Sequence, residues 1–386
     1  MKKVLQISNY YYPNIGGIEQ VARDISNALK DEPGFEVKVI CFNEDSSDGE
    51  HVCHRKETIH EIVDGVEIIK CGCFTKVASQ SLSLTFGREL RKLMNEYDPD
   101  VVIFHYPNPF QAFYLLRYKR RNFKLVLYWH LDITKQKVLK HLFHRQNLAL
   151  IERMEYVLGA TPMHVDKSEY TEHFGSKRLV LPYMIDTSKL ILDKDENILS
   201  DTIRQKYKDS IVGFFIGRHV PYKGLKHLVE ASKELNDEPV KFLIAGEGEL
   251  TDELQEQARG DDKIEFLGRV TDSEKRAYYQ ACDLITFPSV TRNEGFGLAL
   301  AEGMYYGKPA VTFSVYGSGV NYVNLDGVTG IECPNSDSHA FAMAIRKLVN
   351  DSDLRRRMGD AARQRIEENF TPEIFKKNII DFLNTL

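Results

Sequence analysis

The chain has 386 residues, more than a single hydrophobic core usually serves, so two domains are expected. Hydrophobic residues make up 42% of the chain and the net charge is only −5, which excludes a disordered chain and argues against a nucleic-acid partner. No apolar run approaches ~20 residues, so no membrane-spanning helix is expected. Six cysteines, and an N-terminus that resembles a first strand and not an export signal, predict reduced thiols and a cytoplasmic location.

The first half of the chain alternates strands with helices. Apolar residues between Ile18 and Leu29 recur at helical spacing and predict a helix. Strands are expected over residues 3–8, 35–42, 66–71, 98–106 and 123–130, and a basic helix over 110–121. This alternation is typical of a parallel sheet covered by helices.

The second half repeats the alternation. Strands are expected over residues 211–217, 240–246, 263–268, 283–289 and 309–313, and helices over 224–235, 249–259, 273–282 and 296–307. The two series predict an α/β protein with two doubly wound, Rossmann-like domains. We place an N-terminal domain at 1–190, a C-terminal domain at 191–368, and a final amphipathic helix at 369–386 that packs back toward the N-terminal domain.

Cationic residues follow the first strand of the second series. Open α/β sheets bind ligands beyond the carboxyl ends of their strands, and two such edges facing each other would form a cleft between the domains. Arg218 comes directly after the strand at 211–217, and Lys223 precedes the next helix. Two cations beside a helix N-terminus favour a diphosphate, although surface charges on a tight loop remain the plain alternative.

Glycines end the next two strands. Gly246 and Gly248 form a short G-x-G, whose small residues let a backbone or a ligand approach closely. Gly268, Arg269 and Val270 form the following loop. That loop could offer backbone groups to a flat base.

The stretch R-N-E-G-F-G-L-A-L-A-E-G-M places two acids eight residues apart. Glu294 lies in the loop before a helix, and Glu302 lies one to two turns inside it. The helix opens with Gly295, Phe296, Gly297 and Leu298, whose free N–H groups can hold a phosphate or a sugar hydroxyl. Glu302 is placed to accept hydrogen bonds from a ribose diol. The pattern therefore predicts two hydroxyl-binding acids on either side of an anion-binding helix start.

These motifs together resemble a known family. E-G-F-G-L-x-x-x-E, preceded by G-R-x4-K-G, resembles the retaining glycosyltransferases of family 4, which have the GT-B fold. The resemblance covers nearly the whole chain: Y-Y-Y-P-N-I-G-G-I-E-Q is similar to that family's first loop and helix, P-Y-M-I-D to its interdomain strand, and N-Y-V-N-L-D-G-V-T-G to a C-terminal stretch. Y-P-N-P-F and W-H-L-D-I-T-K-Q-K resemble a subgroup of bacterial enzymes, often mannosyltransferases, that build O-antigen and other surface polysaccharides.

The resemblance implies a function and a set of site residues. A hexose, with mannose favoured, would move from a GDP- or UDP-linked donor in the C-terminal domain to a glycan or lipid-linked acceptor in the N-terminal domain. The implied catalytic residues are His130, Arg218, Lys223 and Glu294. The implied donor-binding residues are Gly16, Gly17, Gly246, Gly268, Arg269, Val270, Gly295, Phe296, Gly297, Leu298 and Glu302.

No metal or other cofactor is expected. The D-P-D at residues 98–100 is similar to a metal-binding motif of the other glycosyltransferase fold, but it precedes a strand and so lies at the wrong end for donor chemistry. Retention through same-face attack is favoured because no nucleophile is evident. A nicotinamide-dependent dehydrogenase is rejected because G-x-G-x-x-G is missing after the first strand. A UDP-sugar enzyme with a different sugar and a non-catalytic nucleotide-sugar-binding relative stay open as alternatives.

Residues 101–150 hold nine Lys or Arg and one acid, Asp132. Two interpretations of this basic segment stay open. One is an ordinary solvated face. The other is binding of anionic lipid head groups through residues 117–145, which would place the protein on the inner face of the cell membrane.

Overall fold

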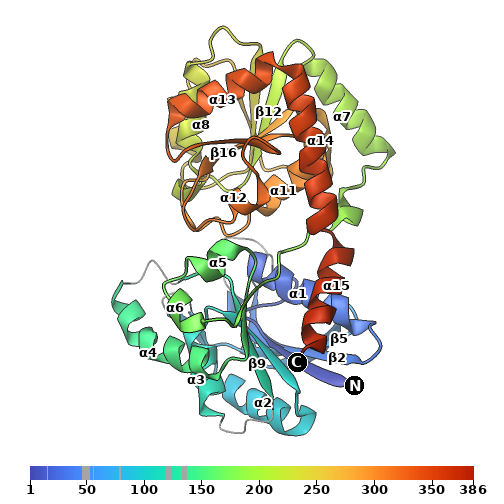
Figure 1. The fold of residues 1–386 in the computed structure, drawn as a ribbon, viewed down its shortest axis with the longest axis vertical. Helices are drawn as coiled ribbons and strands as arrows, with labels where there is room; N and C mark the ends of the chain where they lie inside the picture. The colour runs from blue at the N-terminus through green and yellow to red at the C-terminus, as the bar shows by residue number, and fades with distance from the viewer. Residues whose placement is uncertain (15, 46–52, 55, 78–79, 119–122, 133–136) are drawn as a thin grey trace. The chain divides into compact units, whose positions relative to one another are not determined.

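The computed structural model describes residues 1–386 apart from 15, 46–52, 55, 78–79, 119–122 and 133–136 (Figure 1). The chain forms two compact units: unit 1 comprises Met1–Met184 with Glu373–Leu386, and unit 2 comprises Ile185–Pro372. The sequence placed these divisions at residues 190 and 368. No described helix is both long enough and apolar enough to cross a bilayer.

The main sheet of unit 1 is almost entirely parallel. Its described strands lie in the order β11-β10-β9-β8-β1-β2-β5-β4, and only β4 and the short β3, which pairs with β2, run antiparallel to their neighbours. The strands are β1 Lys2–Ile7, β2 Phe35–Asp45, β3 Cys53–His54, β4 Ile59–Val63, β5 Val66–Gly72, β8 Val101–Tyr106, β9 Lys124–Trp129, β10 Tyr156–Gly159 and β11 Arg178–Val180. A separate hairpin pairs β6 Thr75–Val77 with β7 Gln80–Leu82.

Helices cover this sheet because its strands are apolar on both faces. Strand β8, V-V-I-F-H-Y, is buried at every position. The helical elements are α1 Gly17–Lys30, α2 Phe86–Lys92, η1 Leu93–Tyr97, α3 Pro109–Arg117, α4 Lys137–Arg153, α5 Pro162–Asp166, α6 Thr171–Phe174 and α15 Pro372–Asn384. Helices α2 and α3 pack closely, since a Cβ added to Gly87 would lie 2.2 Å from the ring of Tyr114.

The sheet of unit 2 is entirely parallel in the order β14-β13-β12-β15-β16-β17. Its strands are β12 Ile211–Ile216, β13 Val240–Ala245, β14 Ile264–Gly268, β15 Leu284–Phe287, β16 Ala310–Ser314 and β17 Gly330–Pro334. Its helical elements are η2 Thr187–Leu190, α7 Lys194–Lys206, η3 Pro221–Lys223, α8 Leu225–Lys233, α9 Thr251–Gln257, α10 Asp272–Ala281, α11 Leu298–Tyr305, α12 Val320–Val323, α13 Ser338–Asn350 and α14 Ser352–Asn369.

Both units share one topology. In unit 2 the strand order is third-second-first-fourth-fifth-sixth. Successive strands are added first on one side of β12 and then on the other, so the strand order reverses between β12 and β15. In unit 1 the same order runs from β5 through β2, β1, β8 and β9 to β10, and the change falls between β1 and β8. Ligands of open α/β sheets bind at such switch points, beyond the carboxyl ends of the strands.

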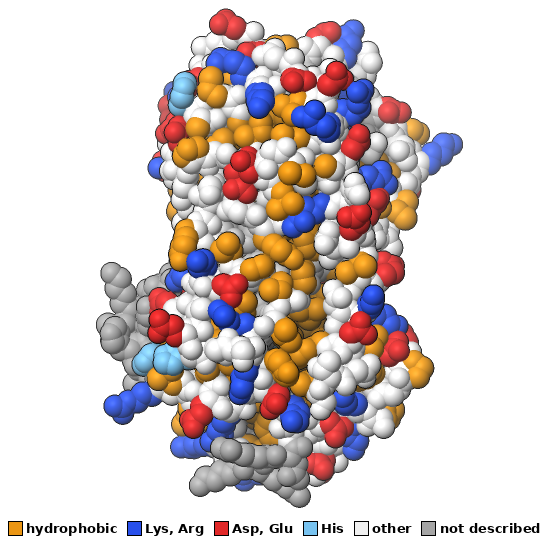
Figure 2. All heavy atoms as spheres, viewed as in Figure 1, with side chains coloured by type: hydrophobic (Ala, Val, Ile, Leu, Met, Phe, Trp, Pro, Cys, Tyr) orange, Lys and Arg blue, Asp and Glu red, His pale blue; other side chains and the backbone are white. Residues whose placement is uncertain are grey.

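The predicted fold class is confirmed, and the expected strands and helices are present with ends that differ by a few residues. The helix expected over 110–121 ends at Arg117, and residues 119–121 lie outside the described chain. The sequence analysis did not assign β3, β4, the β6–β7 hairpin, β10, β11 or β17. Residues 182–186, which resemble an interdomain strand in sequence, form no strand. On the face drawn in Figure 2, acidic and basic side chains are interspersed, so that face carries no broad field of one sign.

Candidate functional site

The switch point of unit 2 is built from loops whose backbones touch. Gly224 has φ 63°, and a Cβ there would lie 2.1 Å from the carbonyl oxygen of Pro288. Gly246 has φ 110°, and its Cβ would lie 2.0 Å from the carbonyl oxygen of Gly217. Only glycine permits both the left-handed backbone and the close approach. The loops after β12, β13 and β15 are therefore held against one another.

Lys223 and Glu294 form a buried ion pair between two of these loops. The Lys223 ammonium donates a hydrogen bond to Oε2 of Glu294, and the two residues are 8% and 9% exposed. The same oxygen accepts a 3.1 Å hydrogen bond from the hydroxyl of Ser289. A buried pair of charges is tolerated only when further hydrogen bonds compensate for lost water, and Ser289 supplies one. Two of the three ammonium N–H groups remain for another acceptor.

Arg218 differs from Lys223 in the surroundings of its side chain. Its side chain is exposed, and within the described part of the chain it makes no side-chain hydrogen bond or ion pair. It follows β12 directly, five residues before Lys223 on the same loop. A free guanidinium beside a buried ammonium at a sheet edge favours an anion with several oxygens.

The stretch from Glu294 to Glu302 crosses from loop to helix as expected. Helix α11 begins at Leu298, and Gly297 caps it with φ 86°. The first N–H groups of a helix have no partner within the helix, so they face the loop of Gly295 and Phe296. Glu302 lies one turn into the helix. Its carboxylate is 3.2 Å from the ammonium of Lys275 on α10.

The two acids therefore each have a lysine of their own. Glu294 pairs with Lys223, and Glu302 pairs with Lys275, which also lies 3.6 Å from Asp272. The sequence analysis identified neither Lys275 nor Ser289. Both lie in segments that it had assigned, the helix at 273–282 and the strand at 283–289, but their partners are 27 and 5 residues away.

The loop of Gly268, Arg269 and Val270 joins β14 to α10. The N–H of Gly246 donates to the carbonyl of Gly268 at 2.7 Å, and Nε of Arg269 lies 3.0 Å from Oε2 of Glu247. These contacts hold the loop against the end of β13.

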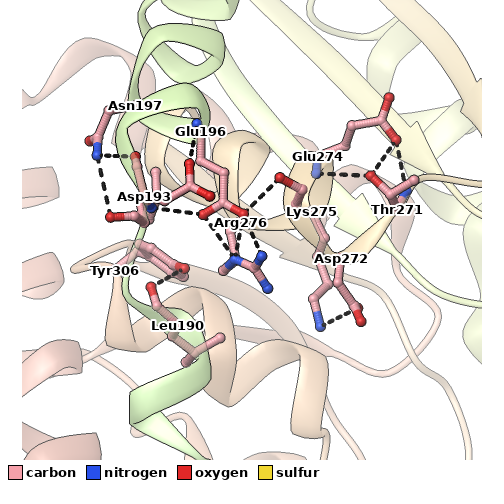
Figure 3. A network of polar contacts seen from close by, with 12 residues as sticks. Leu190, Asp193, Glu196, Asn197, Thr271, Asp272, Glu274, Lys275, Arg276 and Tyr306 are labelled. Atoms are coloured by element: carbon pink, nitrogen blue, oxygen red, sulfur yellow. Dashed lines mark hydrogen bonds and ion pairs between the residues drawn. The ribbon is translucent and has the colours of Figure 1, made fainter.

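A polar network anchors the helix that follows this loop (Figure 3). Thr271 and Glu274 form a reciprocal cap at the start of α10. Arg276 hydrogen-bonds both carboxylate oxygens of Glu196 on α7. The Arg276 hydrogen bonds lower the pKa of Glu196 to about 2. The start of α10 is thus fixed by its own cap and by α7.

In unit 1, His130 lies at the end of β9 inside a buried polar chain. It is 3% exposed. Its Nε2 lies 3.0 Å from Nδ1 of His105, and its Nδ1 contacts the hydroxyl of Tyr183. His105 Nε2 lies 2.9 Å from Oε1 of Gln6. Burial lowers the pKa of His105 to about 3 and that of His130 well below its usual value, so both rings are neutral at pH 7.

The direction of each hydrogen bond in this chain follows from Gln6. Its amide nitrogen donates to Ser26 and to the carbonyl of Ala22, so its oxygen must accept from His105. His105 then accepts at Nδ1 from His130, which accepts in turn from Tyr183. Both ring nitrogens of His130 are therefore engaged within unit 1. Its predicted place beside the donor sugar stays a prediction.

Gly16 and Gly17 open α1 beyond β1. Gly16 caps the helix in an extended conformation, and a Cβ there would lie 2.2 Å from Oε2 of Glu19. The glycine thus leaves room for the Glu19 carboxyl group, whose pKa is raised by burial. The neighbouring residue 15 lies outside the described chain.

Among the described residues, no group of three or more His, Cys, Asp or Glu side chains is placed to hold a metal ion. Asp98 and Asp100 precede β8, at the amino end of the sheet. The predicted metal independence is not tested by this arrangement. Much of the basic segment at 117–145 lies outside the described chain, namely residues 119–122 and 133–136, together with the side chains of 137–142.

Two family descriptions match most of the chain. Residues 15–189 match Glycosyltransferase Family 4, and residues 199–365 match Glycosyl transferases group 1. The O-antigen chain mannosyltransferase C of Escherichia coli is 28% identical over 391 residues, covering 100% of this chain and 98% of the relative. The D-rhamnosyltransferase WbpZ of Pseudomonas aeruginosa is 31% identical over 374 residues, covering 94% and 90%.

Solved structures agree on the fold. HepE of Anabaena, in a complex with UDP-glucose, superposes over 100% of both chains with a TM-score of 0.75 at 18% identity. Sucrose-phosphate synthase of Thermosynechococcus elongatus gives a TM-score of 0.75 at 17% identity, over 100% of this chain and 99% of that one. Taken with the two Rossmann-like units and the sequence matches, these likenesses show that the chain belongs to glycosyltransferase family 4 and has the GT-B fold.

Proposed function

We propose that the protein is a retaining, metal-independent glycosyltransferase of bacterial surface-polysaccharide synthesis. It transfers a hexose, with mannose favoured, from a nucleotide-diphosphate sugar to a glycan or lipid-linked acceptor. The observation that carries this proposal is the buried Lys223–Glu294 pair, with the exposed side chain of Arg218 on the same loop as Lys223, at the switch point of unit 2. The preference for mannose and for surface polysaccharide is supported by the O-antigen mannosyltransferase relative.

The charges at this switch point suit departure of a diphosphate. As the bond between sugar C1 and the phosphate oxygen breaks, negative charge grows on the leaving group. Lys223 still has two N–H groups to offer, and Arg218 has its whole guanidinium. The N–H groups at the start of α11 add further donors. Donors fixed in place before the reaction stabilise such charge without reorganising, and in many enzymes this stabilisation supplies most of the rate enhancement.

Retention follows if the acceptor attacks from the face that the phosphate leaves. The acceptor oxygen bonds to C1, the C1–phosphate bond breaks, and the acceptor proton passes to an oxygen of the leaving diphosphate. In this route Glu294 binds a hydroxyl of the donor sugar and forms no bond to C1, while its Oε2 stays hydrogen-bonded to Lys223 and Ser289. Isolation of a glycosyl adduct on Glu294 would refute this route.

We assign the other parts of the donor to the remaining residues. Glu302 holds the ribose, and residues 268–270 read the base. Gly16, Gly17 and His130 are proposed to serve the donor sugar and the acceptor from unit 1. GDP is favoured as the nucleotide. A UDP-linked donor is the alternative, supported by the binding of UDP-glucose to HepE. A non-catalytic relative is disfavoured because Arg218, Lys223 and Glu294 are all present.

A lipid-linked acceptor would be reached from the cytoplasmic face of the membrane, and unit 1 has a face suited to anionic lipid. Leu84 is 83% exposed and Phe113 is 40% exposed. The side chains of Arg88, Arg91 and Lys92 on α2 and of Arg117 on α3 are exposed as well. Arg117 covers the Phe113 ring at 3.8 Å. Exposed apolar side chains and cations on neighbouring helices favour binding to anionic bilayers.

Vesicle binding tests this membrane contact. Phe113→Ser with Arg117→Glu should lower co-sedimentation with vesicles that contain phosphatidylglycerol, and Arg356→Glu, at an exposed site on α14, should not. Equal binding of the unaltered protein to neutral and anionic vesicles would remove the membrane contact from the proposal.

Nucleotide release tests the whole proposal. GDP- and UDP-sugars are offered to the unaltered protein and to Lys223→Ala. Turnover of one donor, lost in the variant, is the expected result and identifies the sugar and base. No turnover, together with no donor binding by calorimetry, would overturn the proposed function. Binding without turnover directs the search to the acceptor.

A further inference from the structure

Glu294 is held by two buried hydroxyl groups that come from different loops. Ser289 follows β15 and is 1% exposed, and Ser318 follows β16 and is 0% exposed. Ser289 donates to the carboxylate at Oε2, 3.1 Å away. Ser318 donates to the main-chain carbonyl of Glu294, 2.6 Å away. One serine thus contacts the side chain of Glu294 and the other its backbone.

The contact from Ser289 makes the two carboxylate oxygens inequivalent. Oε2 accepts from both Lys223 and Ser289. Oε1 accepts no hydrogen bond from any residue that the structure describes. The terminal torsion of a glutamate is broad, so an ion pair alone leaves the plane of the carboxylate free to turn. A second donor on Oε2 fixes that plane and so the direction in which Oε1 points.

The contact from Ser318 fixes the backbone of the loop that carries Glu294. The Ser318 hydroxyl donates to the carbonyl of Glu294, and Gly295 and Phe296 are the next two residues of the loop. Phe296 is 2% exposed. The loop after β16 is tied down at the same point, since the N–H of Ser318 donates to the carbonyl of Val315. Ser318 therefore links the ends of two neighbouring strands across the start of α11.

We propose that Ser289 and Ser318 are positioning residues that direct Oε1 of Glu294 to a hydroxyl of the donor sugar; the inference rests on the proposed function. Ser289 fixes the orientation of the carboxylate, and Ser318 places the backbone from which the side chain extends. Neither serine touches the donor. Their loss should therefore slow transfer more than it weakens nucleotide binding.

The experiment compares Ser289→Ala and Ser318→Ala with Ser200→Ala, a matched change of a buried serine on α7, which is 5% exposed. For Ser289→Ala we expect kcat to fall by about tenfold, because hydrogen bonds to charged groups are among the stronger ones. The Kd for the nucleoside diphosphate alone should stay within about twofold of the unaltered value, and so should both constants for Ser200→Ala. Ser289→Thr keeps the hydroxyl and should recover most of kcat.

A double-mutant cycle separates positioning from a structural role. In a Glu294→Ala background, Ser289→Ala should change kcat by less than about twofold, because no group remains there to be oriented. An equal loss of kcat in both backgrounds would overturn the inference. So would a Ser289→Ala protein that matches Ser200→Ala in kcat. If the unaltered protein neither binds nor turns over any donor, the proposed function itself fails, and that outcome is distinct from either of these.

Discussion

The two units share a strand order but use their switch points differently. In unit 2 the loops after the first and fourth strands carry Arg218, Lys223 and Glu294, which retain an unpartnered guanidinium, two ammonium N–H groups and a carboxylate oxygen. In unit 1 the fourth strand, β8, contains His105, and the fifth strand, β9, ends just before His130. The ring nitrogens of both histidines are hydrogen-bonded within the fold and both rings are uncharged. The shared topology gives each unit a switch point.

The difference between the units lies in open hydrogen-bonding capacity. A charged group with spare donors can accept an anionic ligand, whereas neutral groups that satisfy one another hold each other in place. We therefore expect substitutions at the unit 2 switch point to change catalysis, and substitutions of Gln6 or His105 in the unit 1 chain to change stability.

The largest effect should come from Lys223→Ala. Removing one preorganised donor to a developing charge costs about 10²- to 10³-fold in kcat. Lys226→Ala, at an exposed position on the adjacent helix α8, is the control. Steady-state nucleotide release measures both. Equal rates for the two variants would mean that the diphosphate does not bind at this switch point.

Backbone contact at the same site should be next. Gly246→Ala combines φ 110° with a Cβ placed 2.0 Å from the Gly217 carbonyl, so we expect a loss of about 3 kcal/mol in the free energy of unfolding. Gly260→Ala is the matched control, since its φ is 82° but nothing lies within 4 Å of the added Cβ. It should lose about 1 kcal/mol. Urea unfolding followed by circular dichroism compares them, and equal losses would show that the loop contact contributes nothing.

Acid should weaken unit 1 through its buried histidines. The folded pKa of His105 is lowered from 6.5 to about 3, so its contribution to stability is complete above pH 6.5 and is lost as the pH falls toward 3. The loss should be at most about 1.4 kcal/mol per pH unit for this histidine. Trp129, the single tryptophan, is buried in unit 1 and reports its unfolding by fluorescence. Stability that is flat between pH 7 and pH 5, or equally steep in His105→Gln, would contradict the neutral chain.

The smallest effect should come from Lys275→Met. Lys275 and Glu302 are 21% and 22% exposed, so water screens their pair, and its loss should cost about 0.5–1 kcal/mol. Because we place the donor ribose on Glu302, the loss should appear as weaker donor binding. The KM for the donor should rise by about two- to fivefold, and kcat should stay unchanged. Lys347→Met, at an exposed site on α13, should leave KM unchanged. A fall in kcat alone would place Lys275 with the reacting groups and not with the ribose.

Much of the architecture was predictable from the sequence because apolar runs and helical spacing are local signals. Strand β4 was missed although its signal was present: V-D-G-V precedes β5, and Asp64 and Gly65 have φ 53° and 87°, as a tight hairpin turn requires. The strand itself is short and half exposed, so its apolar content is weak.

The residues of the candidate site were likewise predictable only in part. Arg218, Lys223, Glu294 and Glu302 could be found because they belong to two short motifs, G-R-x4-K-G and E-G-F-G-L-x-x-x-E, in the loops and helix starts that follow predicted strands. Ser289, Ser318 and Lys275 could not, because their roles depend on partners that only the folded chain brings near. His105 sits inside a buried strand, and no sequence motif marks it; its significance comes from its contact with His130, 25 residues later.

The return of the chain to unit 1 has a consequence for synthesis. Unit 2 is one continuous segment, whereas unit 1 needs both Met1–Met184 and Glu373–Leu386. Helix α15 seats Phe375, Ile379 and Leu383 in the interior, and Lys376 lies 3.0 Å from Glu32. Because domains fold as they leave the ribosome, unit 2 can be complete while the earlier unit still waits for its last helix. The segment made first is therefore the one finished last, and it depends longest on protection from aggregation.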